Sequence, residues 1–169
     1  MRIFKIVLIL SLISSNNIFA ADLNIFSLGF YDFTKRGNDA VDLRFNKRFD
    51  KILFDLGPEE ESLYQIRPFY GLEVTHHGAA YALAGIYIEE KISENIYFTP
   101  NIGGGLYSNG DGKDMGGDVQ FRSELELSYS LKNNNRIGLG VSHISNANTG
   151  RNNPGTNIIS ISYQVPFKK

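Results

Sequence analysis

The sequence contains no cysteine, which excludes a disulfide framework and any thiol chemistry. It also has no tryptophan and only 5 prolines, while 17 glycines and a 12% share of aromatic residues are typical of a sheet protein rich in tyrosine and phenylalanine. The chain also lacks an excess of either charge, because 17 basic and 18 acidic residues give a net charge of -1. Without a basic field to attract it, nucleic acid is not an expected partner.

The sequence has no apolar run long enough to cross a membrane as a helix, which takes about 20 residues. A shorter apolar run, Ile6–Ile13, follows two basic residues and precedes a polar break and the pair Ala20-Ala21. This order predicts a signal peptide, residues 1–20, that is cut after Ala20. The exported part, residues 21–169, has the length of a single domain.

Eight segments of the exported part have the pattern of strands. Each has roughly the ten residues that a tilted membrane strand needs. They are residues 23–33, 40–49, 65–75, 80–90, 95–107, 118–131, 136–146 and 156–167.

The sixth segment alternates most clearly, because its odd-numbered positions are apolar from Val119 to Leu131 and only Ser123 interrupts that face. A soluble sandwich would turn such a face to its core, whereas a membrane barrel would turn it to lipid and keep its polar face in the lumen. The predicted signal peptide, the even number of segments, the aromatic Phe167 and a mean hydropathy of -0.19 favour the barrel. We therefore predict an all-β fold, an eight-stranded antiparallel outer-membrane β-barrel.

The connections sort into two sets if the N-terminus lies in the periplasm. The loops at 34–39, 76–79, 108–117 and 147–155 then face outward, and the turns at 91–94 and 132–135 lie on the opposite, short-turn side. The longer connection at 50–64 is expected to hold a helical turn around Glu59–Glu61.

The last two segments form a hairpin with two polar residues on its apolar face. Ile137, Leu139 and Val141 define that face, and His143 and Ser145 continue it. Residues i and i+2 of a strand lie about 6.5–7 Å apart on one side, so the imidazole can take the proton of the serine. The alternative is a polar pair at a membrane rim that only hydrogen-bonds to its neighbours.

The pattern His143-x-Ser145-Asn146-Ala147, followed by Asn153-Pro154-Gly155 and a closing strand with an aromatic end, resembles the lipid A 3-O-deacylase family of outer-membrane β-barrels. The similarity is strongest over residues 136–167. It implies an esterase on the outer, lipid-facing wall of the barrel, with Ser145 as nucleophile and His143 as general base. Its partners would be lipid A, as part of lipopolysaccharide, and the surrounding outer-membrane lipids.

In the family an acidic residue on the final strand orients the histidine, and this chain has Asn157 there instead. An amide oxygen can accept the Nδ1 proton, but it stabilises an imidazolium less than a carboxylate does. Asp32, at the outer end of the first segment and expected on the lipid face beside the closing strand, is a further candidate for the acid. By resemblance, Asn146 and Asn153 are the candidate donors to the oxyanion, and Asn153 equally suits a turn.

The sequence thus predicts hydrolysis of the acyl ester at the 3 position of lipid A. The alternative is a non-catalytic small barrel, for adhesion or lipid binding, that has lost the catalytic acid. No metal or cofactor is expected. His76 and His77 belong to the predicted loop 76–79, and on a strand they would face opposite sides and could not share a metal. The loop 109–114 lacks the closing glutamate of a calcium loop. Gly103–Gly105 precedes no helix, so it is not a phosphate loop.

Overall fold

Eight long strands, each of 8 to 13 residues, build one antiparallel sheet. The computed structural model describes residues 22–34, 37, 39–57 and 64–167. The long strands are β1 (Asp22–Tyr31), β2 (Ala40–Arg48), β4 (Gln65–Thr75), β5 (Ala80–Tyr87), β7 (Ile96–Ser108), β8 (Val119–Ser130), β9 (Arg136–Ser145) and β10 (Thr156–Phe167). Two short strands, β3 (Phe54–Asp55) and β6 (Glu90–Lys91), pair with β4 and β7. Within the described ranges, no helix is long and apolar enough to span a membrane.

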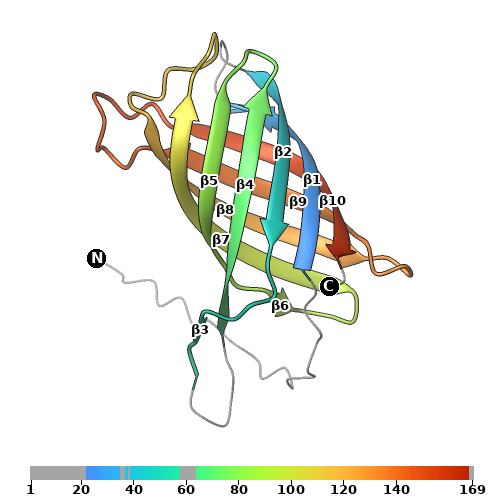
Figure 1. The fold of residues 1–169 in the computed structure, drawn as a ribbon. Helices are drawn as coiled ribbons and strands as arrows, with labels where there is room; N and C mark the ends of the chain where they lie inside the picture. The colour runs from blue at the N-terminus through green and yellow to red at the C-terminus, as the bar shows by residue number, and fades with distance from the viewer. Residues whose placement is uncertain (1–21, 35–36, 38, 58–63, 168–169) are drawn as a thin grey trace, which may run out of the picture.

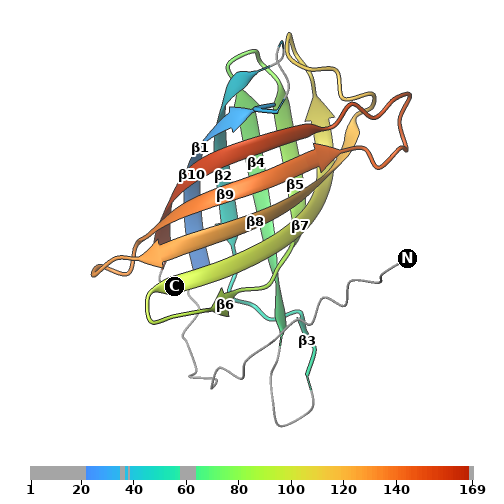
Figure 2. The same cartoon turned by 180° about the vertical axis from the view of Figure 1, so that it is seen from behind.

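The sheet closes into a barrel because each long strand pairs with two neighbours (Figures 1 and 2). The first strand, β1, pairs with both β2 and the last strand, β10, and the pairing of β2 with β4 completes the ring. Closure pairs the backbone groups that a sheet edge would leave free, as a wall in lipid requires. The predicted eight-stranded antiparallel barrel is confirmed, and each predicted segment corresponds to one long strand.

The segment predicted at 80–90 differs from the structure in its length. Its strand β5 ends at Tyr87, and Glu90–Lys91 forms the separate β6. The ladder with β7 stops where Pro100 would be the next partner, because proline has no N–H to donate. The predicted signal peptide, residues 1–20, and the helical turn at Glu59–Glu61 lie outside the described residues.

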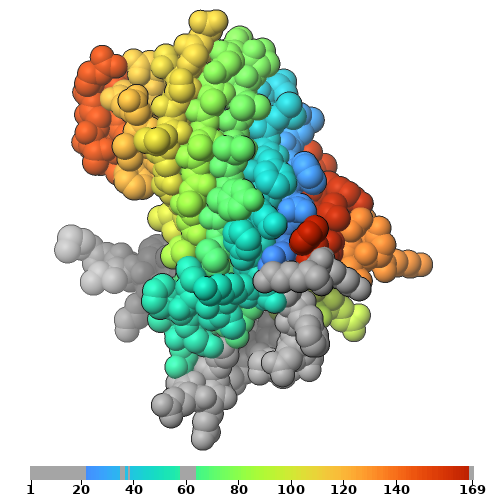
Figure 3. Space-filling model, in the orientation of Figure 1, coloured from blue at the N-terminus to red at the C-terminus, as the bar shows by residue number. Residues whose placement is uncertain are grey.

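The wall of the barrel is apolar outside and polar inside. Outward-pointing side chains along the long strands are 51% to 64% exposed at Leu28, Leu72, Ile102, Leu125, Leu139 and Ile161. The space-filling view shows β2, β4 and β5 forming a continuous surface (Figure 3). A soluble sandwich would bury such apolar side chains, whereas a barrel surrounded by lipid displays them. The arrangement is therefore that of a transmembrane barrel.

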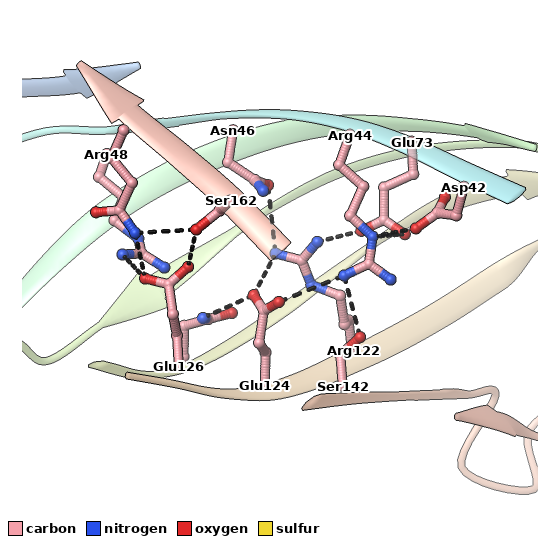
Figure 4. A network of polar contacts seen from close by, with 12 residues as sticks. Asp42, Arg44, Asn46, Arg48, Glu73, Arg122, Glu124, Glu126, Ser142 and Ser162 are labelled. Atoms are coloured by element: carbon pink, nitrogen blue, oxygen red, sulfur yellow. Dashed lines mark hydrogen bonds and ion pairs between the residues drawn. The ribbon is translucent and has the colours of Figure 1, made fainter. Parts of the chain in front are cut away.

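The lumen is filled by a network of charged side chains (Figure 4). Arg44 approaches Glu73 Oε2 at 3.5 Å and Glu124 Oε1 at 3.3 Å. Arg122 also binds Glu73, and Arg48 Nη1 lies 2.7 Å from Glu126 Oε1. All of these side chains are buried. An interior filled in this way is expected of eight strands, and it makes the barrel a scaffold whose outer wall is the accessible surface.

A buried cluster covers this network at the end of the barrel where the loops β1–β2, β4–β5, β7–β8 and β9–β10 lie (Figure 1), here called the loop end. The cluster includes Met115, Ile144 and Ile158. The hydroxyls of Tyr31 and Tyr107 are hydrogen-bonded at 3.4 Å. The Tyr107 hydroxyl donates to the Lys113 carbonyl at 2.8 Å. These contacts hold the β7–β8 loop across the mouth of the barrel. The loops share one end, as predicted.

Candidate active site

Strand β9 presents His143 and Ser145 on the outer face of the barrel, near its loop end. The residues between and before them, Ile144 and Ser142, point inward and are 0% and 2% exposed. His143 is exposed and Ser145 is half-buried. The period of two that predicted a shared face is therefore present in the structure.

Asn157 lies directly opposite His143 in the pairing of β9 with β10. Its Oδ1 is 2.8 Å from His143 Nδ1, and its Nδ2 donates to Thr34 Oγ1 at 3.0 Å. An amide oxygen only accepts, so Nδ1 carries the ring proton in this contact and Nε2 has its lone pair free. A neutral imidazole with a free Nε2 is the form that can act as a general base.

Ser145 lies two residues nearer to the loop end than His143 and opposite Phe121. In the described part of the chain, no hydrogen bond joins the Ser145 and His143 side chains. Gly155 approaches the imidazole from the end of the β9–β10 loop, since a Cβ built on Gly155 would lie 3.0 Å from His143 Cε1 and 3.4 Å from Nε2. With φ of +56°, Gly155 also has a backbone conformation that favours glycine. The absent side chain leaves the Nε2 edge of the ring uncovered.

The two asparagines predicted beside the oxyanion have different environments. Asn146 is 0% exposed, and its amide nitrogen donates to the carbonyls of Met115 at 3.0 Å and Asn152 at 2.6 Å. Both amide hydrogens are thus used to hold the β7–β8 and β9–β10 loops together. Asn153 is exposed, and its Oδ1 accepts the backbone N–H of Asn146 at 3.3 Å.

Asp32 has a position that rules it out as the acid of this site. It lies inside the loop end with 0% exposure, and its Oδ2 is 2.6 Å from Lys113 Nζ. Lys113 also donates to the Gly155 carbonyl at 2.7 Å. The expectation that Asp32 reaches the lipid face is therefore wrong, because the chain has turned at Asp32, where φ is +57°.

An apolar groove of about 520 Å³ begins beside His143 and Asn157. Its walls include one row of directly opposed residues across five strands: Asn157, His143, Ser123, Ile102 and Ile86. Leu125 and Val141, which are more than half exposed, line it beside that row. Because the strands are tilted (Figure 2), the row runs away from the loop end as it passes from β10 to β5.

The other candidates for chemistry lie elsewhere. His76 and His77 are in the β4–β5 turn, within the predicted loop 76–79, and their rings lie with centroids 3.9 Å apart at a tilt of 40°. His76 Nδ1 accepts the backbone N–H of Val41 at 2.9 Å. In the loop 109–114, Asp114 Oδ1 accepts the N–H of Gly116 at 2.8 Å. The described residues hold no group of three His, Asp or Glu that could bind a metal.

Sequence reasoning missed two residues of this site. Ser123 interrupted an otherwise apolar face, and that signal marks the place where the groove passes β8. Thr34 gave no signal, because it lies in a loop 123 residues from Asn157 and only the pairing of β1 with β10 brings the two together.

The fold and the site define a class of protein, a small outer-membrane-type β-barrel with a polar pair on its outer wall. The sequence model of the family "Lipid A 3-O-deacylase (PagL)" matches residues 41–166. The chain therefore belongs to the lipid A 3-O-deacylase family, and the resemblance read from its C-terminal hairpin is confirmed.

One named relative is similar in sequence, and solved structures are similar in fold alone. A lipid A deacylase PagL of Bordetella bronchiseptica is 36% identical over 76 residues, which cover 44% of this chain and 43% of the relative. The match thus spans less than half of that relative. The crystal structure of the outer membrane enzyme PagL is similar with a TM-score of 0.64 and 17% identity, over 86% of this chain and 99% of that one. A de novo designed transmembrane β-barrel has a TM-score of 0.52 and 13% identity, over 86% and 95%.

Proposed function

We propose that this protein is an esterase of the outer membrane that hydrolyses the acyl chain linked to the 3 position of lipid A. The observation that carries the proposal is the outward-facing His143–Asn157 pair at the head of an apolar groove, with Ser145 beside it. Membership of the lipid A 3-O-deacylase family supplies the substrate class.

Acylation begins when the Ser145 hydroxyl rotates toward His143 Nε2. Nε2 takes the hydroxyl proton while Oγ attacks the ester carbonyl, and Asn157 Oδ1 holds the Nδ1 proton of the resulting imidazolium. The imidazolium then gives its Nε2 proton to the departing sugar oxygen. This step releases the 3-hydroxyl of the sugar and leaves the acyl chain as an ester on Ser145.

Deacylation repeats the sequence with water in place of serine. Nε2 of His143 takes a proton from the water, the hydroxide attacks the acyl carbonyl, and Ser145 leaves with the proton that His143 returns. The net reaction consumes one water and yields one free fatty acid and one sugar hydroxyl. It needs neither a metal nor a cofactor.

The negative oxygen of each tetrahedral intermediate requires hydrogen-bond donors. We assign this role to the Asn153 amide, because its side chain is exposed and its Oδ1 accepts the Asn146 N–H, which leaves its NH₂ group as the donor. Asn146 instead holds the loops beside the site in place, since its own amide hydrogens are bound to carbonyls of two loops.

The groove suits the acyl chain that is removed. It starts at His143 and continues over Ile102 and Ile86, so a chain whose ester lies at Ser145 can extend along the wall among apolar side chains. The sugar would then lie toward the loop end. In this arrangement the loop end faces outward, and residues 1–20 are removed on export. N-terminal sequencing of the protein purified from outer membranes tests the removal.

Mass spectrometry of lipid A from cells with and without this protein tests the activity. We expect the wild type to remove the mass of one 3-linked acyl chain, and Ser145→Ala and His143→Ala each to abolish that loss. Both side chains lie on the outer surface, so both variants should keep the heat-modifiable mobility of a folded barrel. Wild-type activity in either variant would contradict these roles.

The substitution Asn157→Asp separates the esterase from a non-catalytic barrel. It preserves the side-chain length that places an oxygen 2.8 Å from Nδ1, and it adds the charge that stabilises an imidazolium. We expect equal or higher activity for Asn157→Asp and a fall of about 10²-fold for Asn157→Ala. An inactive wild type whose Asn157→Asp variant is active would identify a barrel that has lost the reaction with its acid.

A further inference from the structure

We infer that Thr34 is a positioning residue of this site, which holds the Asn157 amide so that its oxygen, and not its nitrogen, meets His143. The inference rests on the proposed esterase. It starts from the two contacts of Asn157, whose Oδ1 is 2.8 Å from His143 Nδ1 and whose Nδ2 donates to Thr34 Oγ1 at 3.0 Å. The amide thus bridges the imidazole and the hydroxyl.

The direction of this bridge decides which ring nitrogen is basic. With Oδ1 toward the ring, Nδ1 carries the proton and Nε2 can take the proton of Ser145. If the amide turned over, its NH₂ group would donate to Nδ1, the ring proton would move to Nε2, and the base would be lost. A carboxylate offers an oxygen in either orientation, so this need arises from the asparagine.

Thr34 supplies the acceptor that favours the productive direction. Its hydroxyl oxygen satisfies the NH₂ group at the outer wall of the barrel, where an unpaired donor is costly. Without that oxygen, the NH₂ group gains more by turning to Nδ1 of His143, which is an acceptor in the other tautomer.

The segment that carries Thr34 is fixed against β10 beyond the last paired residues of the sheet. The backbone N–H of Phe33 donates to the Asn157 carbonyl at 3.2 Å. Lys113, which is 7% exposed, ties the start of the segment to the residue just before β10, because it binds Asp32 Oδ2 at 2.6 Å and the Gly155 carbonyl at 2.7 Å. Thr34 is therefore held at a defined place beside Asn157.

A double-mutant cycle tests whether Thr34 acts through Asn157. Thr34→Val keeps the shape of the side chain and removes its oxygen, and we expect kcat to fall about 10-fold with little change in KM, as for one orienting hydrogen bond. In an Asn157→Ala background, the same substitution should change kcat less than about 2-fold. Thr34→Ser should restore most of the rate. Losses that multiply in the double variant, or a Thr34→Val variant with wild-type kcat, would overturn the inference.

Thr75→Val is the matched control, because Thr75 also uses its hydroxyl oxygen in a loop-end turn, accepting from the Ala79 N–H at 3.2 Å. It should retain the wild-type kcat. Heat-modifiable mobility of each variant shows whether the barrel has folded.

A readout without turnover separates this inference from the proposed esterase. Nitrogen-15 NMR of histidine-labelled protein in detergent distinguishes Nδ1–H from Nε2–H imidazole, and His143→Gln assigns the signal among the 3 histidines. We expect Nδ1–H in the wild type and a shift toward Nε2–H in Thr34→Val. An unchanged tautomer would contradict the role of Thr34 even in an active enzyme, and a changed one would support it even if the lipid A assay fails.

Discussion

At the scale of single residues, the imidazole of His143 is surrounded by atoms from three parts of the chain. Asn157 and Gly155 come from β10 and the loop before it, and Ser145 lies two residues along β9. Asn157 Oδ1 contacts the ring at Nδ1, and Gly155 lies against its Cε1 and Nε2 edge. Small changes on that edge should therefore act on the proton acceptor more than on the barrel.

Gly155→Ala tests this contact. The new Cβ would lie 3.0 Å from His143 Cε1 and 3.4 Å from Nε2, so the ring must shift or its base must be partly covered. We expect kcat for deacylation to fall at least about 10-fold, because small misplacements of a catalytic base are costly. Assays of lipid A in detergent give the rate.

Gly78→Ala is the matched control, since Gly78 also has a positive φ, +77°, but no atom lies within 4 Å of a Cβ built there. The two variants share a backbone cost of about 1 kcal/mol. Equal activity in both would mean that the contact of Gly155 with the ring is unimportant.

At the scale of elements, five strands that are consecutive in the sheet align a single row of residues along the groove. These strands are β10, β9, β8, β7 and β5. The small residue in that row, Ser123 on β8, separates His143 from Ile102. A larger side chain there would fill the part of the groove nearest to His143. The pairing of strands thus gives the site its apolar extension.

Ser123→Leu should lower kcat/KM about 10-fold or more for long acyl chains and less for short ones, as added methylene groups in an apolar site usually do. The barrel should fold as before, because leucine suits a surface in lipid. Ala82→Leu is the control, since Ala82 also points outward but does not line the groove. A series of synthetic acyl esters measures the preference, and an unchanged preference would remove the groove from substrate binding.

At the scale of the whole molecule, the buried charges of the lumen hold the wall from inside. Arg122 binds Glu73 and reaches Asn46 Oδ1 at 3.3 Å, so it links β8 to β4 and β2 across the barrel. Its guanidinium carbon also lies 5.4 Å from the centre of the Phe69 ring. The barrel should depend on such links, since a buried charge that loses its partner is costly.

Arg122→Met should lower the free energy of unfolding by roughly 2–4 kcal/mol, because among the described residues Glu73 then keeps only Arg44, at 3.5 Å, and the buried network loses one of its positive charges. The change in unfolding free energy is measured by titrating each variant with urea and monitoring the folded fraction by its heat-modifiable mobility. Arg151→Met is the control, because Arg151 lies 3.5 Å from Asp114 with its side chain 83% exposed, and it should change stability by less than about 1 kcal/mol. Equal stabilities of the two variants would show that the network is not needed for folding.

The sequence by itself determined the eight strands, their inner and outer faces, and the placement of His143 and Ser145 on one side of β9. These features depend on neighbours along the chain, because a strand turns its side chains with a period of two whatever lies beside it. The motif of the C-terminal hairpin was likewise local, and it was enough to indicate the family. The length of β5 was not determined locally, since Pro100 of the neighbouring strand ended the ladder of β5 with β7.

Only the tertiary structure decided which residues support the pair. Register across β9 and β10 brings Asn157 to His143, and barrel closure between β1 and β10 brings Thr34 to Asn157. The same closure turns Asp32 inward to Lys113, away from the place its sequence position indicated. These contacts join residues 14 to 123 positions apart, and no local period encodes them, because they arise only when hydrogen bonds between strands fix the register of the closed sheet.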